Sequence, residues 1–222
     1  NLTVTLNDSA AVATLPLTTV DASAFTGDSL TVTAVEADSG VTVTTGSEAL
    51  SATVGDGANT ITGTAGDDTI TTGSGADTIV SYAGDDTIEA GDGVNTITVT
   101  DGENDIDGGE GVDTITAGNG NNTIDGGDGA DVIVAGTGNN TFTNSAGNAT
   151  ITAGTGNNTV TNTAGNSTIT LGNGTNTVNL TAGNSTVVTG SGADDINITA
   201  GNNDITAGAG NDTISLGSGN DP

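Results

Sequence analysis

Almost all the side chains of this sequence that could take part in chemistry are carboxylates. Its 222 residues include 28 Asp and Glu but no Lys, Arg, His or Cys, which gives a formal net charge of −28. Without His, Cys or Lys, most nucleophile and general-base arrangements are absent, and we expect no enzyme here. Carboxylates remain as groups that could hold a cation.

The absence of basic residues also excludes several partners. A nucleic-acid-binding protein needs cations to neutralise phosphates, and this chain has none. An anionic membrane surface would repel it for the same reason, and no apolar run approaches membrane-spanning length. We therefore expect neither nucleic acid as a partner nor insertion into a membrane.

Several acids recur at a fixed spacing. Three pairs of Asp are each separated by eighteen residues: Asp68 and Asp86, Asp113 and Asp131, Asp194 and Asp212. Three further residues, Asp77, Asn95 and Asp221, lie a multiple of nine residues from these pairs. If the chain returns to the same edge of the molecule every eighteen residues, each pair presents stacked oxygen ligands.

A nine-residue repeat supplies the elements that would position these acids. From Val54 the chain holds eighteen complete units and a partial one, with Gly at position 4 of all nineteen and an apolar residue at position 8 of every complete unit. Position 8 is almost always β-branched with polar neighbours, which predicts a short strand with one inward side chain. Position 1 adds an apolar side chain in some units, among them Val99, Leu171 and Leu216.

The residues between these strands predict tight turns. Gly at position 4 and mostly Asn or Asp at position 6 favour positive φ and side-chain-to-backbone hydrogen bonds. Strand, turn, strand, turn makes a flattened coil with two units per revolution. Rungs about 4.8 Å apart then stack into a rod roughly 45 Å long, with a parallel sheet on each of two faces.

Residues 1–53 lack this period. The segments 2–6, 30–35 and 41–44 alternate like strands. We interpret residues 1–53 as an irregular β lead-in that covers the open edge of the first rung, with residues 54–222 as the repeat domain. A small separate β-sandwich is the alternative. At the other end, Pro222 either ends the solenoid or lies within a longer polypeptide.

Two units match the pattern G-G-x-G-x-D-x-U-x completely, where U is a large apolar residue. They begin at Gly108 and Gly126. Here the chain resembles the calcium-binding nonapeptide repeats of the RTX (repeats-in-toxin) family, in register over residues 54–222. The resemblance implies a right-handed parallel β-roll in which each Ca²⁺ lies between stacked turns, held by position-6 carboxylates and glycine-loop carbonyls. The implied glycine ligands are Gly66, Gly84, Gly109, Gly111, Gly127, Gly129, Gly192 and Gly210.

The chemistry agrees with calcium, because Ca²⁺ takes six to eight oxygen ligands and these turns offer only oxygen. No acid occurs between Val132 and Ala193, so we expect that stretch to be largely free of metal. There, Asn139, Asn157 and their neighbours would form amide ladders instead. The alternative for every Asp is a turn-capping side chain that binds nothing.

The function that these features favour is a calcium-stabilised structural module outside the cell. Calcium would neutralise the acidic turns and couple binding to folding, which suits a chain that stays unfolded at low cytosolic calcium. The segment 18–27 is similar to lead-ins of bacterial surface-layer proteins, so we expect a secreted surface-layer, matrix or adhesin component that assembles with copies of itself. Two alternatives are an ice- or crystal-binding solenoid using outward Thr-x-Thr rows, and an RTX accessory region of a secreted enzyme or toxin.

Overall fold

The computed structural model describes residues 2–5, 19–35, 40–46 and 48–221, and all regular elements in that part of the chain are strands. A helix able to cross a membrane does not occur there. The strands are β1 (Leu2–Thr5), β2 (Thr19–Ala22), β3 (Leu30–Ala34), β4 (Thr42–Thr45), β5 (Leu50–Val54), β6 (Thr60–Thr62), β7 (Thr69–Thr71), β8 (Thr78–Val80), β9 (Thr87–Glu89), β10 (Thr96–Thr98), β11 (Asp105–Asp107), β12 (Thr114–Ala117), β13 (Thr123–Asp125), β14 (Val132–Ala135), β15 (Thr141–Asn144), β16 (Thr150–Ala153), β17 (Thr159–Asn162), β18 (Thr168–Leu171), β19 (Thr177–Leu180), β20 (Thr186–Val188), β21 (Asp195–Ala200), β22 (Asp204–Thr206) and β23 (Thr213–Ser218).

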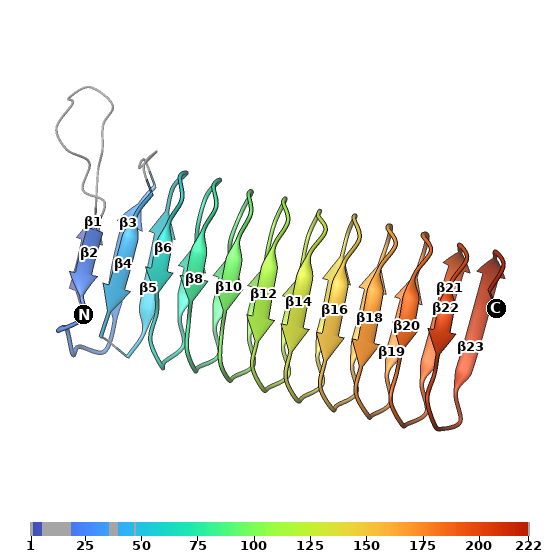
Figure 1. The fold of residues 1–222 in the computed structure, drawn as a ribbon. Helices are drawn as coiled ribbons and strands as arrows, with labels where there is room; N and C mark the ends of the chain where they lie inside the picture. The colour runs from blue at the N-terminus through green and yellow to red at the C-terminus, as the bar shows by residue number, and fades with distance from the viewer. Residues whose placement is uncertain (1, 6–18, 36–39, 47, 222) are drawn as a thin grey trace.

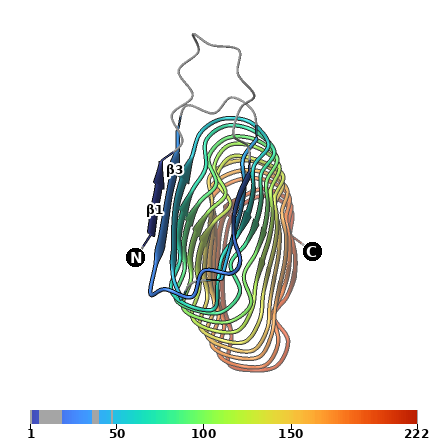
Figure 2. The same cartoon turned by 90° about the vertical axis from the view of Figure 1, so that its left-hand side faces the viewer.

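The strands form two parallel sheets that face each other. Odd-numbered strands make one sheet, here the odd sheet, and even-numbered strands make the other, the even sheet, each in sequence order. The chain therefore alternates between the sheets and climbs one rung at a time, as Figure 1 shows. Seen along its axis, the coil is flattened, with the two sheets on its long sides (Figure 2). The predicted all-β parallel solenoid of the β-roll type is confirmed.

The register confirms two repeats per turn. Ile106 pairs with Ile124 in the odd sheet, and Ile115 pairs with Ile133 in the even sheet. Both pairs are eighteen residues apart, which brings equivalent positions of alternate repeats side by side. With the described odd sheet holding twelve strands, a spacing of about 4.8 Å makes the rod roughly 50 Å long.

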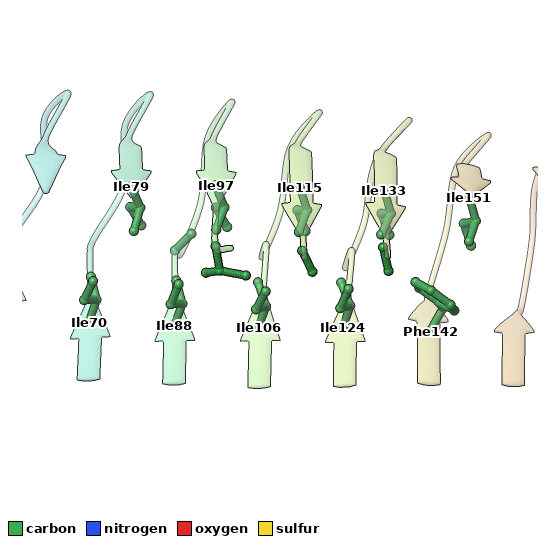
Figure 3. Packing of buried hydrophobic residues seen from close by; sticks show 14 of the residues in the cluster. Ile70, Ile79, Ile88, Ile97, Ile106, Ile115, Ile124, Ile133, Phe142 and Ile151 are labelled. Carbon is green, nitrogen blue, oxygen red and sulfur yellow. The ribbon is translucent and has the colours of Figure 1, made fainter. Parts of the chain in front are cut away.

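The core is a thin double row of side chains between the sheets. Position 8 is fully buried from Ile61 to Ile196, and Figure 3 shows ten of these side chains, Ile70 to Ile151, in two facing rows. Position 1 adds Val99 and Leu171, both buried. The expectation that Leu216 joins this core is wrong: it is 43% exposed, because β23 pairs on one side only, with β21, in the described chain.

The strands before the repeats lie in the same two sheets. The predicted strands at 2–6, 30–35 and 41–44 correspond to β1, β3 and β4, with residue 6 outside the described residues. Their spacing is irregular: Leu2 pairs with Leu30 and Leu30 with Leu50, steps of 28 and 20 residues. The predicted boundary between residues 53 and 54 falls within β5, and Pro222 is outside the described residues.

Candidate calcium sites

The position-6 residues form two columns, one along each edge of the flattened coil. The residues that immediately precede the odd strands, here the odd column, include Asp68, Asp86, Asp194 and Asp212. The other edge carries the even column, in which Asp77, Asn95, Asp113 and Asp131 precede even strands and Asp221 follows at the same spacing. The structure thus stacks the predicted pairs on common edges.

These side chains point inward rather than into solvent. Asp68, Asp77, Asp86, Asp113 and Asp131 are at most 1% exposed. One carboxylate oxygen of each accepts a hydrogen bond from a backbone N–H one rung earlier, which belongs to Leu50 for Asp68 and to the position-6 residue for the other four. The N–H of Asn95 donates to Asp113 Oδ1 at 2.7 Å, and that of Asp113 donates to Asp131 Oδ1 at 2.9 Å. Position 6 therefore ties each rung to the next.

In five position-6 residues the second carboxylate oxygen is buried and has no hydrogen-bond partner among the residues that the structure describes. The atoms are Oδ2 of Asp77, Asp86, Asp113, Asp131 and Asp194. Leaving a buried polar group unsatisfied costs about 1–3 kcal/mol, and more when the group is charged. Each of these oxygens therefore requires a proton or a cation.

Asparagines at the same position show what surrounds that second atom. The Asn59 amide nitrogen donates to the carbonyls of Gly55 and Gly57 at 3.0 and 2.9 Å, and that of Asn158 donates to Gly154 and Gly156 at 3.3 and 3.1 Å. Glycine-loop carbonyls thus converge where an Asp would place Oδ2. An acceptor facing acceptors is repelled unless a cation lies between them.

Calcium fits this oxygen-only arrangement. Ca²⁺ prefers carboxylate and carbonyl oxygens in a flexible set of six to eight ligands. Within the described residues, no three Asp or Glu side chains converge on one point. A cation here would consequently combine one or two carboxylates with carbonyl oxygens from the glycine loops, which is the ligand set that the sequence resemblance implied.

Asp68 differs from the other aspartates of its column. Its Oδ1 accepts from Leu50 N at 2.7 Å and from Thr64 Oγ1 at 2.9 Å. Its Oδ2 accepts from Thr64 N at 2.7 Å and from Ser81 Oγ at 3.0 Å. Four donors satisfy this carboxylate, so the structure gives Asp68 no need of a cation. At the other end, Asp212 and Asp221 each accept a backbone N–H one rung earlier, from Asp194 and Asn203.

The predicted glycines allow the turns to stack closely. Gly111 has φ 144°, in a region that L side chains rarely adopt. A Cβ at Gly111 would lie 1.5 Å from the carbonyl oxygen of Gly93, one rung away, and a Cβ at Gly129 would lie 1.5 Å from that of Gly111. Glycine at these positions is thus required by backbone contact between rungs, whether or not its carbonyl binds a cation.

The electrostatics of the buried aspartates reflect their missing partners. Burial raises the pKa of Asp113 to about 6, against the stabilising backbone N–H of Asn95, and burial likewise raises the pKa of Asp86 to about 6. Burial also raises the pKa of Asp131. Without a cation, these carboxyl groups hold their protons more tightly than exposed aspartates do.

The neutral stretch is held by amides instead. In the odd column, the amide nitrogen of Asn122 donates to Asn140 Oδ1 at 3.0 Å, and that of Asn140 to Asn158 Oδ1 at 3.0 Å. The predicted ladder at the exposed turns is also present, in a side-chain-to-backbone form: Asn157 N donates to Asn139 Oδ1 at 2.8 Å. These bonds supply the rung-to-rung contacts where acids are absent.

Two buried residues were not anticipated from the sequence. Asn144 and Asn162, at position 1 of their units, are 0% and 2% exposed, and Oδ1 of each lacks a hydrogen-bond partner. Position 1 is otherwise apolar, small or hydroxylated, so an Asn there is the signal that could have singled them out.

Comparison with protein families agrees with this geometry. The family described as RTX calcium-binding nonapeptide repeat (4 copies) matches overlapping segments that together span residues 53–221, namely 53–88, 80–115, 89–124, 107–142, 143–178, 152–187, 170–203 and 188–221. No curated protein and no solved structure matches the chain. The match covers well over half of the sequence, so the chain belongs to the family of RTX calcium-binding nonapeptide repeat proteins, and calcium is the ligand of its repeats.

Proposed function

We propose that this protein is a calcium-folded structural module that acts outside the cell, as part of a surface layer, matrix or adhesin. One observation carries the calcium dependence: among the described residues, five buried carboxylate oxygens lack a partner at the repeat position where Asn59 instead donates to two glycine carbonyls. In this proposal Asp77, Asp86, Asp113, Asp131 and Asp194 are the principal ligands, together with the glycine-loop carbonyls of their turns.

The charge of the chain supports coupling between calcium binding and folding. A net charge of −28 without any positive residue makes the compact state repel itself. A cation that binds only the stacked turns removes this repulsion and stabilises the fold by mass action. Such a chain would stay open at low intracellular calcium and fold where calcium is abundant, which is the basis for placing it outside the cell.

A calcium titration tests this function. Chelator-treated protein is titrated with Ca²⁺ and followed by far-UV circular dichroism, with Mg²⁺ as the matched control. We expect a cooperative gain of β signal with Ca²⁺ and a much weaker response to Mg²⁺, because Mg²⁺ demands near-ideal octahedral geometry and gives up its waters reluctantly. A full β signal in chelator that Ca²⁺ does not stabilise against heating would contradict the proposal.

The even sheet offers a surface for self-assembly. From β4 to β20 its outward positions hold only Thr and Val, in register from strand to strand. The odd sheet carries acids on its outer face: Glu89, Asp105, Asp107, Asp125 and Asp195. Two copies of a chain with no positive charge can approach without repulsion only through an uncharged face, so we infer that copies associate through the even sheet.

Matched charge substitutions test this face. Val134→Asp with Thr152→Asp places acids on neighbouring even strands, and Thr143→Asp with Thr161→Asp does the same on the odd sheet. We expect sedimentation velocity in saturating Ca²⁺ to show self-association of the parent and of the odd-sheet variant, and its loss in the even-sheet variant. Equal association of the two variants would exclude this face.

The same face favours a second candidate function, binding to ice or to a crystal surface. Its threonines and valines are flat and regularly spaced because the strands pair in strict register, as at Thr96–Thr114 and Thr114–Val132. Thermal hysteresis and ice recrystallisation measured on the parent and the two variants distinguish this function. Activity that disappears only in the even-sheet variant would support it, and an inactive parent would exclude it.

A further inference from the structure

A cluster of unpartnered oxygens surrounds the small space beside Gly126. A Cβ placed on Gly126 would lie 2.7 Å from Asn144 Oδ1 and 3.0 Å from Asp131 Oδ2. Both oxygens are buried and have no hydrogen-bond partner, and both residues are 0% exposed. One rung earlier, a Cβ on Gly108 would lie 2.9 Å from Asp113 Oδ2 and 3.1 Å from the carbonyl oxygen of Gly126. The two nearest atoms at Gly126 are thus acceptors, and the Ile133 Cδ1 methyl, 3.1 Å from the same Cβ, closes its inner side.

Asn144 belongs to a repeat unit that has no side-chain oxygen at position 6. Position 6 of its unit is Ala149, so the rung after Asp131 offers no carboxylate or amide in the even column. Asn144 enters the interior from position 1 of that rung instead. Its amide nitrogen donates to Ala146 O at 3.2 Å, which turns Oδ1 back toward Gly126 and Asp131.

We propose that Asn144 is a calcium ligand, and that with Asp131 it forms a calcium site at the start of the neutral stretch. The inference rests on the proposed calcium-binding function and adds to it a ligand outside the G-G-x-G-x-D pattern. An amide oxygen suits Ca²⁺, which accepts Asn side chains beside carboxylates. Burial favours this role, since a buried acceptor that no donor satisfies gains a partner when a cation binds beside it.

Asn162 is the matched control. It also occupies position 1 with a buried, unpartnered Oδ1, one rung further along. Position 6 of the rung below it is Ala149, whereas Asn144 has Asp131 in the corresponding place. Its amide nitrogen is used in a hydrogen bond to Ser167 Oγ. Without an adjacent carboxylate, Asn162 has no charge with which to hold a cation.

The test counts calcium ions bound by the full chain. Equilibrium dialysis against radioactive Ca²⁺ and calorimetric titration compare the parent with Asn144→Ala, Asn144→Asp and Asn162→Ala, after circular dichroism at saturating Ca²⁺ has confirmed their fold. We expect Asn144→Ala to lose one ion per chain, or to bind it at least about tenfold more weakly. Loss of a residue that only supports a metal ligand already weakens metal binding by about tenfold or more, and loss of a direct ligand should cost at least as much. Asn144→Asp should retain the ion, and Asn162→Ala should match the parent.

A second variant reaches the same site if Asn144→Ala does not fold. Gly126→Ala places a methyl group 2.7 Å from Asn144 Oδ1 and 3.0 Å from Asp131 Oδ2, so it should also remove one ion by filling space beside both proposed ligands. Unchanged stoichiometry and affinity in Asn144→Ala or in Gly126→Ala would overturn the assignment of Asn144 alone. A parent chain that binds no calcium would overturn the proposed function itself, so the two failures are distinguishable.

Discussion

Turns with Asn at position 6 differ from turns with Asp at position 6 in one side-chain atom, which is an amide nitrogen in Asn and a carboxylate oxygen in Asp. An Asn at position 6 places an N–H donor where glycine-loop carbonyls converge, as Asn59 does toward Gly55 and Gly57. An Asp in the same column places an unpartnered oxygen there, as at Asp77. The Asn amide thus binds the glycine-loop carbonyls by itself, whereas the Asp carboxylate needs a cation between it and those carbonyls. We therefore expect the choice between Asn and Asp to decide the calcium requirement of a rung, except at Asp68, whose carboxylate Thr64 and Ser81 satisfy.

Exchanging the carboxylates for amides tests this idea directly. Asp113→Asn with Asp131→Asn should reduce the number of bound calcium ions and raise the β content in chelator. Each new amide can donate to the loop carbonyls, which relieves about 1–3 kcal/mol of unsatisfied buried polarity per site. Calcium titration and circular dichroism in chelator measure the two effects.

Asp113→Ala with Asp131→Ala is the comparison for that variant. It removes the ligands without supplying donors, and it also removes the oxygens that accept the N–H groups of Asn95 and Asp113. This variant should lose calcium and remain loose in chelator. Equal β content of the two variants in chelator would show that the amide does not replace the ion.

The buried carboxyls also predict a response to acid. Burial raises the pKa of Asp86 and Asp113 from 3.8 to about 6 in the folded chain. A raised folded-state pKa means that folding takes up protons, so its contribution to stability is complete below about pH 4 and is lost as the pH rises through about 6. In chelator, lowering the pH from 7 to about 4.5 should therefore increase the β signal and the midpoint of thermal unfolding. A fall in both quantities would contradict the assigned burial.

At the scale of the element, each short strand contributes very little by itself. A strand such as β12 has two inward side chains, Ile115 and Ala117, between outward residues. Its stability comes from the rungs on both sides, because each strand pairs with the same positions eighteen residues away. Loss of packing at one rung should therefore be felt locally and at its direct neighbours.

A core truncation tests how far this effect extends. Ile115→Ala removes a fully buried side chain and should cost about 2–5 kcal/mol, whereas Thr116→Ala on the outer face of the same strand should change stability by less than about 0.5 kcal/mol. Hydrogen exchange in saturating Ca²⁺ should show lost protection in β10, β12 and β14 for the first variant only. Uniform loss along the whole rod would indicate a single cooperative unit instead.

The whole molecule combines two regions that carry acids with a neutral one between them. By Asp131 the chain has used 23 of its 28 acids, and the next acid is Asp194. Between them the odd column is an amide ladder from Asn140 through Asn158 to Asn176. Calcium dependence should consequently be uneven along the rod.

Hydrogen exchange in chelator measures this unevenness. We expect residues 132–193 to keep more protection than residues 54–131, because amides link the rungs of the odd column there and carboxylates repel one another in the acidic turns. Added Ca²⁺ should then protect residues 54–131 most strongly. Faster exchange in the neutral stretch than in the acidic stretch, in chelator, would contradict the division.

The sequence by itself determined the parallel solenoid, its two repeats per rung and the columns that stack position-6 acids. These follow from an unbroken nine-residue period, since a strand alternation repeated in phase leaves few ways to bury Ile106, Ile115 and Ile124. The period also carried the family relationship and the calcium chemistry.

Only the tertiary structure decided which side chains lack partners. Asp68 and Asp86 occupy the same place in the repeat, yet Thr64 and Ser81 satisfy Asp68 while Asp86 Oδ2 remains unpartnered. Asn144 stands outside the repeat pattern, and its Oδ1 lies beside Gly126, as Asp131 Oδ2 does, only because their rungs stack. Hydrogen-bond satisfaction depends on atoms brought together from different rungs, and a local pattern of residue types does not contain those contacts.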